Sequence, residues 1–250
     1  MARYQVKIAY DGTEFFGMQR QLEARTVQGE IENSLRQIGW DDQTILVAGR
    51  TDAGVHANGQ VISFDLTWKH STEKLKKAMN SVFPQDIAAK AVRETENKYH
   101  PRYDALSRSY VYQIYCRSDR DPIMDRYNLR IWPEIELDVL TEAANLLIGE
   151  YDFSAFGTPP KKNGSTIREV FAASWTKEND QYIFTVRANA FLYHMVRRMV
   201  NVQIEIAHGR KTVEFISDAL DGKFDGVIQG IAPPQGLFLE KVDYADKKIN

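Results

Sequence analysis

Residues 49–58, GRTDAGVHAN, gather three chemically capable side chains among small residues. Arg50 offers a planar fork for a phosphate or carboxylate, Asp52 a carboxylate that can act as base or nucleophile, and His56 a titratable ring. The glycines permit positive φ angles and close approach of a ligand to the backbone. Asp and Gly are also ordinary turn residues, and a loop histidine often hydrogen-bonds the backbone. The stretch is therefore either a catalytic loop or a turn, and we expect His56 to be structural.

A second stretch with side chains capable of chemistry is FLYHMVRRMV at residues 191–200, which contains two adjacent arginines. In a helix over residues 191–209, Arg197 and Arg198 point about 100° apart, so the two serve different purposes. Arg197 is bordered by Met and Val residues at helical spacing, which places it at the edge of a buried stripe. Arg198 is expected to face phosphate or solvent.

The composition is that of a folded protein, 43% apolar and 26% charged. The net charge of −2 and a sequence pI of about 6.2 give no argument for nucleic-acid binding, although local basic clusters can gather on one face. Cys116 is the only cysteine and the five histidines show no metal-ligand spacing, so we expect no disulfide, metal or redox cofactor. The first residues alternate polar and apolar side chains, and no apolar stretch approaches the length of a membrane span, so we expect no leader segment and a cytoplasmic location.

The elements that must position these residues follow from hydrophobic periodicity. In the first half, strands are expected over 3–10, 44–48, 59–66 and 86–94, and helices over 26–38 and 71–83, N-capped by Thr26 and Ser71. The order of strands and helices is that of a ferredoxin-like fold. The ten-residue loop at 49–58 joins two strands expected to form a hairpin, and it exceeds the usual loop of about two to five residues. Its length marks it as a candidate site.

The second half repeats this pattern with an inserted helix. Strands are expected over 109–116, 168–177, 181–188 and 236–245, and helices over 137–149, 191–209 and 212–222. We therefore expect an α+β fold of two ferredoxin-like halves, residues 1–100 and 101–250, whose antiparallel sheets form a cleft. The segment GTPPKKNGS at 157–165 is the one expected mobile loop.

Six motifs in order along nearly the whole chain carry a resemblance to a known family. They are YDGTEFFGMQRQ with TVQGEIENSL, GRTDAGVHANGQV, RSYVYQIY, GEYDFSAFG, FLYHMVRRMV and APPQGLFLEKVDY. Together they resemble the TruA family of tRNA pseudouridine synthases. The resemblance implies the pseudouridine synthase fold and an isomerase that converts uridine to pseudouridine in the anticodon stem-loop of tRNA, typically at positions 38, 39 and 40. It also implies a homodimer that needs no cofactor and acts on tRNA, not on DNA or a membrane.

The same resemblance assigns three principal residues. Asp52 matches the family's catalytic aspartate, which acts at the ribose-base junction, and we expect it to be the nucleophile. The sequence leaves open whether it attacks covalently or first removes a ribose proton. A neighbouring guanidinium favours the ionised form of such a carboxylate. Arg197 matches the partner of that aspartate. Tyr110 matches a substrate-contacting tyrosine, because an aromatic face holds a base that has left its stack. Tyr112 shares a strand face with Tyr110 and is expected in the core.

Further basic residues are candidate substrate contacts. Arg50 either anchors the RNA backbone or braces Asp52, and the sequence leaves both roles open. Phosphate contacts are expected from Arg168, from Arg198 if it does not face solvent, and from the lysines of the 157–165 loop, Lys161 and Lys162.

The chain also departs from the usual family pattern. Met18 stands where the family usually has Trp, Asn201 where it usually has Gly, and YHPRYDA at 99–105 replaces a more typical FHARFSA. None of these departures touches Asp52, Tyr110 or Arg197. They bear on the packing of the helix near residue 201 and on the RNA surface around residues 99–104, and hence on which tRNA positions are modified.

Two other functions compete with this interpretation. A non-catalytic RNA-binding relative is disfavoured because a pure binder has no need of the reactive Asp52 carboxylate. A hydrolase using Asp52 as a phosphoryl acceptor is disfavoured because no second carboxylate stands near Asp52 to hold Mg²⁺.

Overall fold

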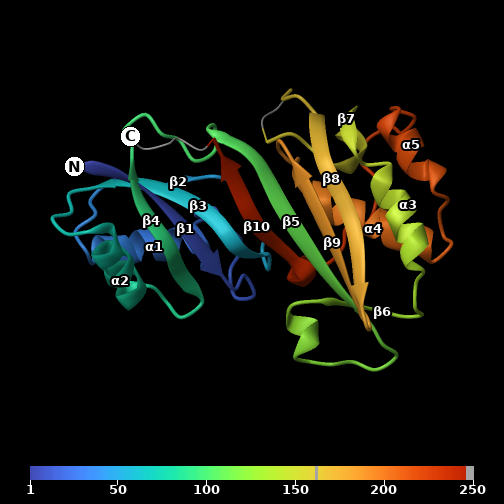
Figure 1. The fold of residues 1–250 in the computed structure, drawn as a ribbon, viewed down its shortest axis with the longest axis horizontal. Helices are drawn as coiled ribbons and strands as arrows, with labels where there is room; N and C mark the ends of the chain where they lie inside the picture. The colour runs from blue at the N-terminus through green and yellow to red at the C-terminus, as the bar shows by residue number, and fades with distance from the viewer. Residues whose placement is uncertain (161–162, 246–250) are drawn as a thin grey trace. The chain divides into compact units, whose positions relative to one another are not determined.

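The computed structural model describes residues 1–160 and 163–245, and it divides the chain into two compact units. The first contains residues Met1–Leu106 together with the chain from Phe238 onward, which is most of the last strand, and the second contains Ser107–Leu237. Both units mix strands with helices, so the expectation of an α+β fold is confirmed. Figure 1 shows the course of the chain through these elements.

The first unit is built on one sheet flanked by two helices. Its elements are β1 (Ala2–Tyr10), α1 (Val27–Arg36), β2 (Leu46–Val47), β3 (His56–Leu66), α2 (Thr72–Val82), β4 (Ile87–Thr95) and β10 (Leu237–Tyr244). Strand β1 lies between β4 and β3, antiparallel to both. The other edge of β3 is shared by β2, which runs antiparallel to it, and by β10, which runs parallel to it. The helices α1 and α2 contact each other beside this sheet (Figure 1).

The helices of the first unit begin where the sequence predicts. The Thr26 side chain accepts a hydrogen bond from the Gly29 amide, and Ser71 accepts one from the Lys74 amide, which caps each helix at its N-terminus. Helix α1 buries Val27, Ile31 and Leu35 against the sheet. The predicted strand at 59–66 is longer than expected and begins at His56, because β10 pairs with His56 and Ala57. The loop between β2 and β3 therefore spans residues 48–55.

The second unit is also a sheet with helices packed beside it. Its elements are β5 (Ala105–Cys116), β6 (Leu129–Ile131), α3 (Leu137–Asn145), β7 (Gly149–Asp152), β8 (Ile167–Glu178), β9 (Gln181–Ala188), α4 (Met195–Ala207), α5 (Glu214–Leu220) and three short 3-10 turns, Met124–Arg126, Ser154–Phe156 and Pro234–Gly236. The antiparallel order is β7-β8-β9-β5, with β6 parallel to β5. Helices α3 and α4 contact each other, and α3 packs along β8.

Several predicted boundaries in this unit differ from the structure. The strand expected over 109–116 begins earlier, at Ala105, and the helix expected over 137–149 ends earlier, at Asn145. The helix expected over 191–209 begins only at Met195, because His194 adopts a left-handed φ of 63° that a helix cannot contain. From Met195 onward the helix buries the stripe that the sequence predicts, including Met199 and Val200. Asn201, one of the departures from the family pattern, is accommodated by Gly230. A Cβ added at Gly230 would lie 2.7 Å from the side-chain nitrogen Nδ2 of Asn201.

Candidate active site

The candidate residues divide between the two units. Asp52 and Arg50 belong to the first unit, on the loop at residues 48–55, which joins β2 to β3. Tyr110, Arg168, Arg197 and Arg198 belong to the second unit.

Backbone hydrogen bonds anchor the Asp52 loop on both sides of the aspartate. The Met18 amide donates to the Thr51 carbonyl at 3.0 Å, and the Gly54 amide donates to the Phe15 carbonyl at 3.2 Å. Asp52 itself is half-buried. The segment 15–18 thus holds the residue immediately before Asp52 and the residue two positions after it, which fixes the peptide that carries the carboxylate.

Two glycines outside the loop make this close contact possible. A Cβ at Gly12 would lie only 2.0 Å from the Val55 carbonyl oxygen. Gly17 has a φ of +91°, and a Cβ there would lie 2.8 Å from the Thr51 carbonyl oxygen. Side chains at these positions would collide with backbone atoms, which cannot move aside cheaply. The loop therefore rests directly on the backbone of the N-terminal segment.

Side chains from the sheet hold the same loop. The Tyr10 hydroxyl lies 2.7 Å from the Thr51 hydroxyl, and burial raises the pKa of Tyr10 to about 12. The Gln60 amide donates to the Gly49 carbonyl at 2.9 Å. Tyr10 therefore keeps its proton over the working pH range and serves as a neutral hydrogen-bonding group for Thr51, the residue before Asp52.

Arg50 and His56 differ sharply in their surroundings. The Arg50 side chain is exposed, and it makes no hydrogen bond or ion pair with any residue in 1–160 or 163–245. His56 is 1% exposed; its Nδ1 accepts a hydrogen bond from the Gly12 amide at 3.0 Å, and its ring stacks on Phe238 with centroids 4.6 Å apart. These contacts agree with the structural role expected for His56. They leave Arg50 as a guanidinium available to a ligand.

Two tyrosines occupy one face of β5 in the second unit. Tyr110 is 9% exposed, and its ring packs edge-on against Phe191 with centroids 5.1 Å apart. Tyr112 is fully buried, and its hydroxyl donates to the Pro233 carbonyl at 2.8 Å. Burial raises the pKa of Tyr112. Tyr112 is therefore the core residue that the sequence predicts.

Arg197 lies on helix α4 and is 9% exposed. Its Nε donates to the Ala232 carbonyl at 2.7 Å, and the Ala232 amide donates to the Arg197 carbonyl at 3.1 Å. The Arg197 charge also opposes the upward shift in the pKa of Tyr112, so the two groups lie close enough to interact. The adjacent carbonyls of Ala232 and Pro233 thus hold both Arg197 and Tyr112. Sequence reasoning assigned Ala232 and Pro233 no role of their own, although both begin the APPQGLFLEKVDY motif that carries part of the family resemblance.

The remaining arginines are bonded to nearby backbone carbonyls. Arg198 Nε donates to the Ile228 carbonyl at 3.1 Å. Arg168 Nη1 donates to the carbonyls of Ser165 and Ile167, and burial lowers the pKa of Arg168. Their expected contact with RNA stays a prediction. The expected phosphate contacts Lys161 and Lys162 lie outside the described residues.

Two general properties bear on the chemistry of the site. Among residues 1–160 and 163–245, no group of three or more His, Cys, Asp or Glu side chains is arranged to hold a metal ion. Over the same residues, no helix has the length and apolar character needed to cross a membrane.

These features define an enzyme class. The first unit carries a carboxylate on a glycine-supported loop, and the second carries a largely buried arginine and an aromatic side chain. These side-chain types are those of a mixed α+β enzyme that acts on a nucleotide through a carboxylate. The family model described as tRNA pseudouridine synthase matches residues 7–104 and 143–245. The chain belongs to the tRNA pseudouridine synthase family.

Individual relatives match over nearly their whole length. The tRNA pseudouridine synthase A of Geobacillus sp. (strain WCH70) is 36% identical over 97% of this chain and 98% of the relative. The tRNA pseudouridine synthase A of Dictyoglomus turgidum is 37% identical over 98% of this chain and 100% of the relative. That of Leuconostoc citreum is 34% identical over the full length of both chains. The family resemblance and the isomerase activity on tRNA that the sequence predicts are thereby confirmed.

Solved structures align more weakly. The crystal structure of a Cbf5-Nop10-Gar1 complex aligns with 86% of this chain but only 44% of that chain, at 13% identity and a TM-score of 0.36. A likeness at this level does not bear on function.

Proposed function

We propose that this isomerase acts on uridines in the anticodon stem-loop of tRNA, at positions 38, 39 and 40, with Asp52 as the nucleophile. The observation that carries this proposal is the anchoring of the loop on both sides of Asp52, at Thr51 and at Gly54. A nucleophile needs a fixed approach to the reacting carbon, and backbone bonds to a neighbouring segment provide one.

The reaction is an isomerisation with no net redox change. The Asp52 carboxylate attacks C1′ of the ribose, the C1′–N1 bond breaks, and uracil leaves as an anion. The base then turns and C5 attacks C1′, which releases the carboxylate. The C5 hydrogen departs as a proton and N1 gains one, so atoms and electrons balance.

Arg197 and Tyr110 have supporting roles in this proposal. Arg197 matches the arginine that partners the catalytic aspartate of the family, and the same role is proposed for it toward Asp52. Its Nε donates to the Ala232 carbonyl, which fixes one edge of the guanidinium. Tyr110, on β5, holds the extruded uracil against its ring. The contact with Phe191 keeps the Tyr110 ring in place.

The outer arginines complete the proposed RNA contacts. Arg50 is exposed and makes no side-chain hydrogen bond or ion pair with the described residues, which favours an anchor for the RNA backbone. Arg168 and Arg198 each use part of their guanidinium on local carbonyls, and the five N–H donors of an arginine allow further contact with a phosphate. We further propose that the protein acts in the cytoplasm as a homodimer.

The experiment that tests this function follows the C5 hydrogen. Purified protein is mixed with an anticodon stem-loop RNA carrying tritium at C5 of uridine, and release of tritium to solvent is measured. Release by the wild-type protein and its loss in Asp52→Ala, with binding of the RNA retained, are expected. Asp41→Ala, at an exposed aspartate of the same unit, is the matched control and is expected to release tritium normally. Release that survives in Asp52→Ala would overturn the role of Asp52.

A further inference from the structure

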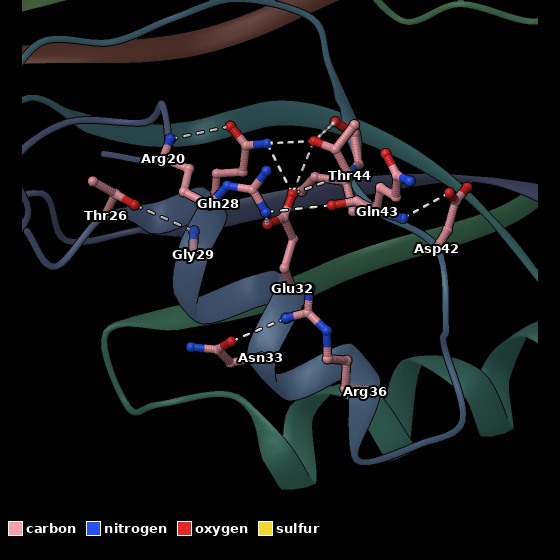
Figure 2. A network of polar contacts seen from close by, with 11 residues as sticks. Arg20, Thr26, Gln28, Gly29, Glu32, Asn33, Arg36, Asp42, Gln43 and Thr44 are labelled. Atoms are coloured by element: carbon pink, nitrogen blue, oxygen red, sulfur yellow. Dashed lines mark hydrogen bonds and ion pairs between the residues drawn. The ribbon is translucent and has the colours of Figure 1, made fainter. Parts of the chain in front are cut away.

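Helix α1 buries a carboxylate in the first unit. Glu32 is 1% exposed, and its Oε2 accepts a hydrogen bond from Arg20 Nη1 at 2.7 Å (Figure 2). Its Oε1 accepts one from Gln28 Nε2, one turn earlier on the same helix, at 2.8 Å. Carboxylates are rarely buried, and those that are buried are usually paired, as Glu32 is with Arg20.

The segment before β2 also contacts this carboxylate. Thr44 Oγ1 lies 3.0 Å from Glu32 Oε1, and the Ile45 amide lies 3.2 Å from the same oxygen. Gln28 Nε2 also donates to Thr44 Oγ1 at 2.8 Å, which closes the network that Figure 2 shows. Glu32 therefore receives donors from three parts of the chain: the segment at Arg20, helix α1 and the segment that leads into β2.

Two of these parts lead directly to the Asp52 loop. Arg20 follows the segment 15–18, whose Phe15 carbonyl and Met18 amide bond to the loop on either side of Asp52. Met18 is also tied to the helix, because the Gln28 amide donates to its carbonyl at 2.9 Å. Ile45 immediately precedes β2, and β2 leads into residues 48–55. Glu32 thus connects the support of the loop to the strand that enters it.

We propose that Glu32 and Arg20 are positioning residues, whose ion pair fixes the two segments that hold the Asp52 loop; this inference rests on the proposed role of Asp52. A buried ion pair stabilises a fold little more than a well-packed apolar pair of similar size. Its charged hydrogen bonds are directional, however, and here they define where the chain segments must lie. The network therefore contributes to the orientation of Asp52 through the segment 15–18, without contact with the substrate.

The test replaces the carboxylate by its isosteric amide. Glu32→Gln keeps the shape and Oε1, but it turns an NH₂ group toward the donor Arg20 Nη1. The kcat for tritium release from the stem-loop RNA is expected to fall roughly tenfold or more, with KM changed less than about twofold, because the loop is misplaced while RNA contacts remain. Hydrogen exchange at the Met18 and Gly54 amides, which make the anchoring bonds, is expected to accelerate roughly tenfold or more relative to other protected amides of the same unit.

Two further variants keep the outcome interpretable. Arg20→Gln changes a half-exposed side chain, and the same loss of kcat is expected. Urea unfolding of each variant, with kcat measured on the folded fraction, separates a loss of stability from a loss of orientation. If Glu32 and Arg20 act together, kcat of the double variant, Glu32→Gln with Arg20→Gln, falls no further than kcat of either single variant. A double variant that loses the product of the two single effects would overturn the inference.

The matched control is another ion pair of the same unit that does not touch the loop. Arg3 and Asp65 join β1 to β3 at 2.7 Å. Asp65→Asn is expected to lower stability while kcat and the exchange at Met18 and Gly54 stay as in the wild type. Wild-type kcat and exchange in both Glu32→Gln and Arg20→Gln, or an equal loss of kcat in Asp65→Asn, would overturn the inference. Failure of the proposed function is distinct: it shows as no tritium release by wild-type protein, or as release by Asp52→Ala, and leaves the exchange result unaffected.

Discussion

The Asp52 loop and the Arg197 helix are held in place by different physical means. Asp52 lies on a loop without regular structure, anchored by backbone bonds to Phe15 and Met18 and resting on glycine positions that admit no side chain. Arg197 lies on helix α4, where packing of the buried stripe fixes the backbone and the Ala232 carbonyl accepts a hydrogen bond from the guanidinium Nε. The carboxylate is thus positioned by the backbone, and the arginine by side-chain packing.

The two regions nevertheless share one device. In each, a buried tyrosine hydroxyl bonds to a residue adjacent to the site: Tyr10 to Thr51, next to Asp52, and Tyr112 to Pro233, next to Ala232. Burial raises the pKa of both tyrosines, so both hydroxyls stay neutral. This comparison indicates that both site groups depend on neutral hydrogen bonds from the sheets beneath them. Four changes of decreasing expected effect probe it.

The largest effect is expected from Arg197→Met. If Arg197 supplies a preorganised charged donor at the site, its loss should lower kcat/KM by roughly 10²–10³-fold. The measurement is tritium release from the stem-loop RNA under single-turnover conditions. Arg210→Met, an exposed arginine paired with Glu205, is the control and is expected to keep wild-type activity. Retention of more than about a tenth of the activity in Arg197→Met would remove Arg197 from the site.

A smaller effect, on stability, is expected from Gly12→Ala. The new methyl group would meet the Val55 carbonyl at 2.0 Å, so we expect the free energy of unfolding in urea to fall by roughly 3 kcal/mol. Gly39→Ala is the control: Gly39 has a φ of +93° but nothing within 4 Å, and a cost of about 1 kcal/mol is expected from strain alone. Equal costs at the two glycines would contradict the close contact beneath the loop.

Arg50→Gln separates the two roles left open for Arg50. If Arg50 anchors the RNA backbone, the variant raises KM for the stem-loop by roughly tenfold and reduces the magnitude of the slope of log K against log salt by about 0.7–0.9. If Arg50 instead braces Asp52, the variant lowers kcat and leaves the salt slope unchanged. The exposure of Arg50 favours the first result. A lower kcat with an unchanged slope would assign Arg50 to Asp52 instead.

The smallest effect is expected from Tyr10→Phe. Loss of the hydroxyl removes its bond to Thr51 and lowers the free energy of unfolding at neutral pH by about 1 kcal/mol. The pH dependence is more telling. Because the folded pKa of Tyr10 is raised from 10.0 to about 12, the stability linked to it is complete below pH 10 and is lost as the pH rises to 12.

Urea unfolding between pH 10 and 12 measures this linkage. In Tyr10→Phe the decline in stability with pH should be shallower than in the wild type by about 1.4 kcal/mol per pH unit. An unchanged slope would show that Tyr10 is not buried as described. Tyr112→Phe provides the corresponding measurement in the second unit, where the slope should change in the same direction.

Local sequence signals predicted the elements well, and tertiary contacts explain what they missed. The caps at Thr26 and Ser71 are confirmed because a cap depends only on the residues beside it. The start of β3 at His56 depends on pairing with β10, far away in the chain, and no local pattern contains that pairing. The left-handed φ of His194 is likewise set by its surroundings, since residues other than glycine seldom adopt it.

The site follows the same division. Asp52 was found from its motif, and the resemblance that pointed to it is confirmed at the level of the family. The carbonyls of Ala232 and Pro233, and the network around Glu32, were not predicted because a backbone carbonyl has no sequence signature and a buried glutamate resembles a surface one in sequence. The roles of Asp52, Tyr110 and Arg197 remain predictions that the variants above address.

The most direct test of the central claim is the sequencing of pseudouridine in tRNA from a strain that lacks this protein. Pseudouridine at positions 38, 39 and 40 should be absent, should return when the wild-type protein is expressed, and should stay absent when Asp52→Ala is expressed at the same level. Restoration of these pseudouridines by Asp52→Ala would contradict the assignment of Asp52 as the nucleophile, and their persistence in the deleted strain would contradict the assignment of the anticodon stem-loop as substrate.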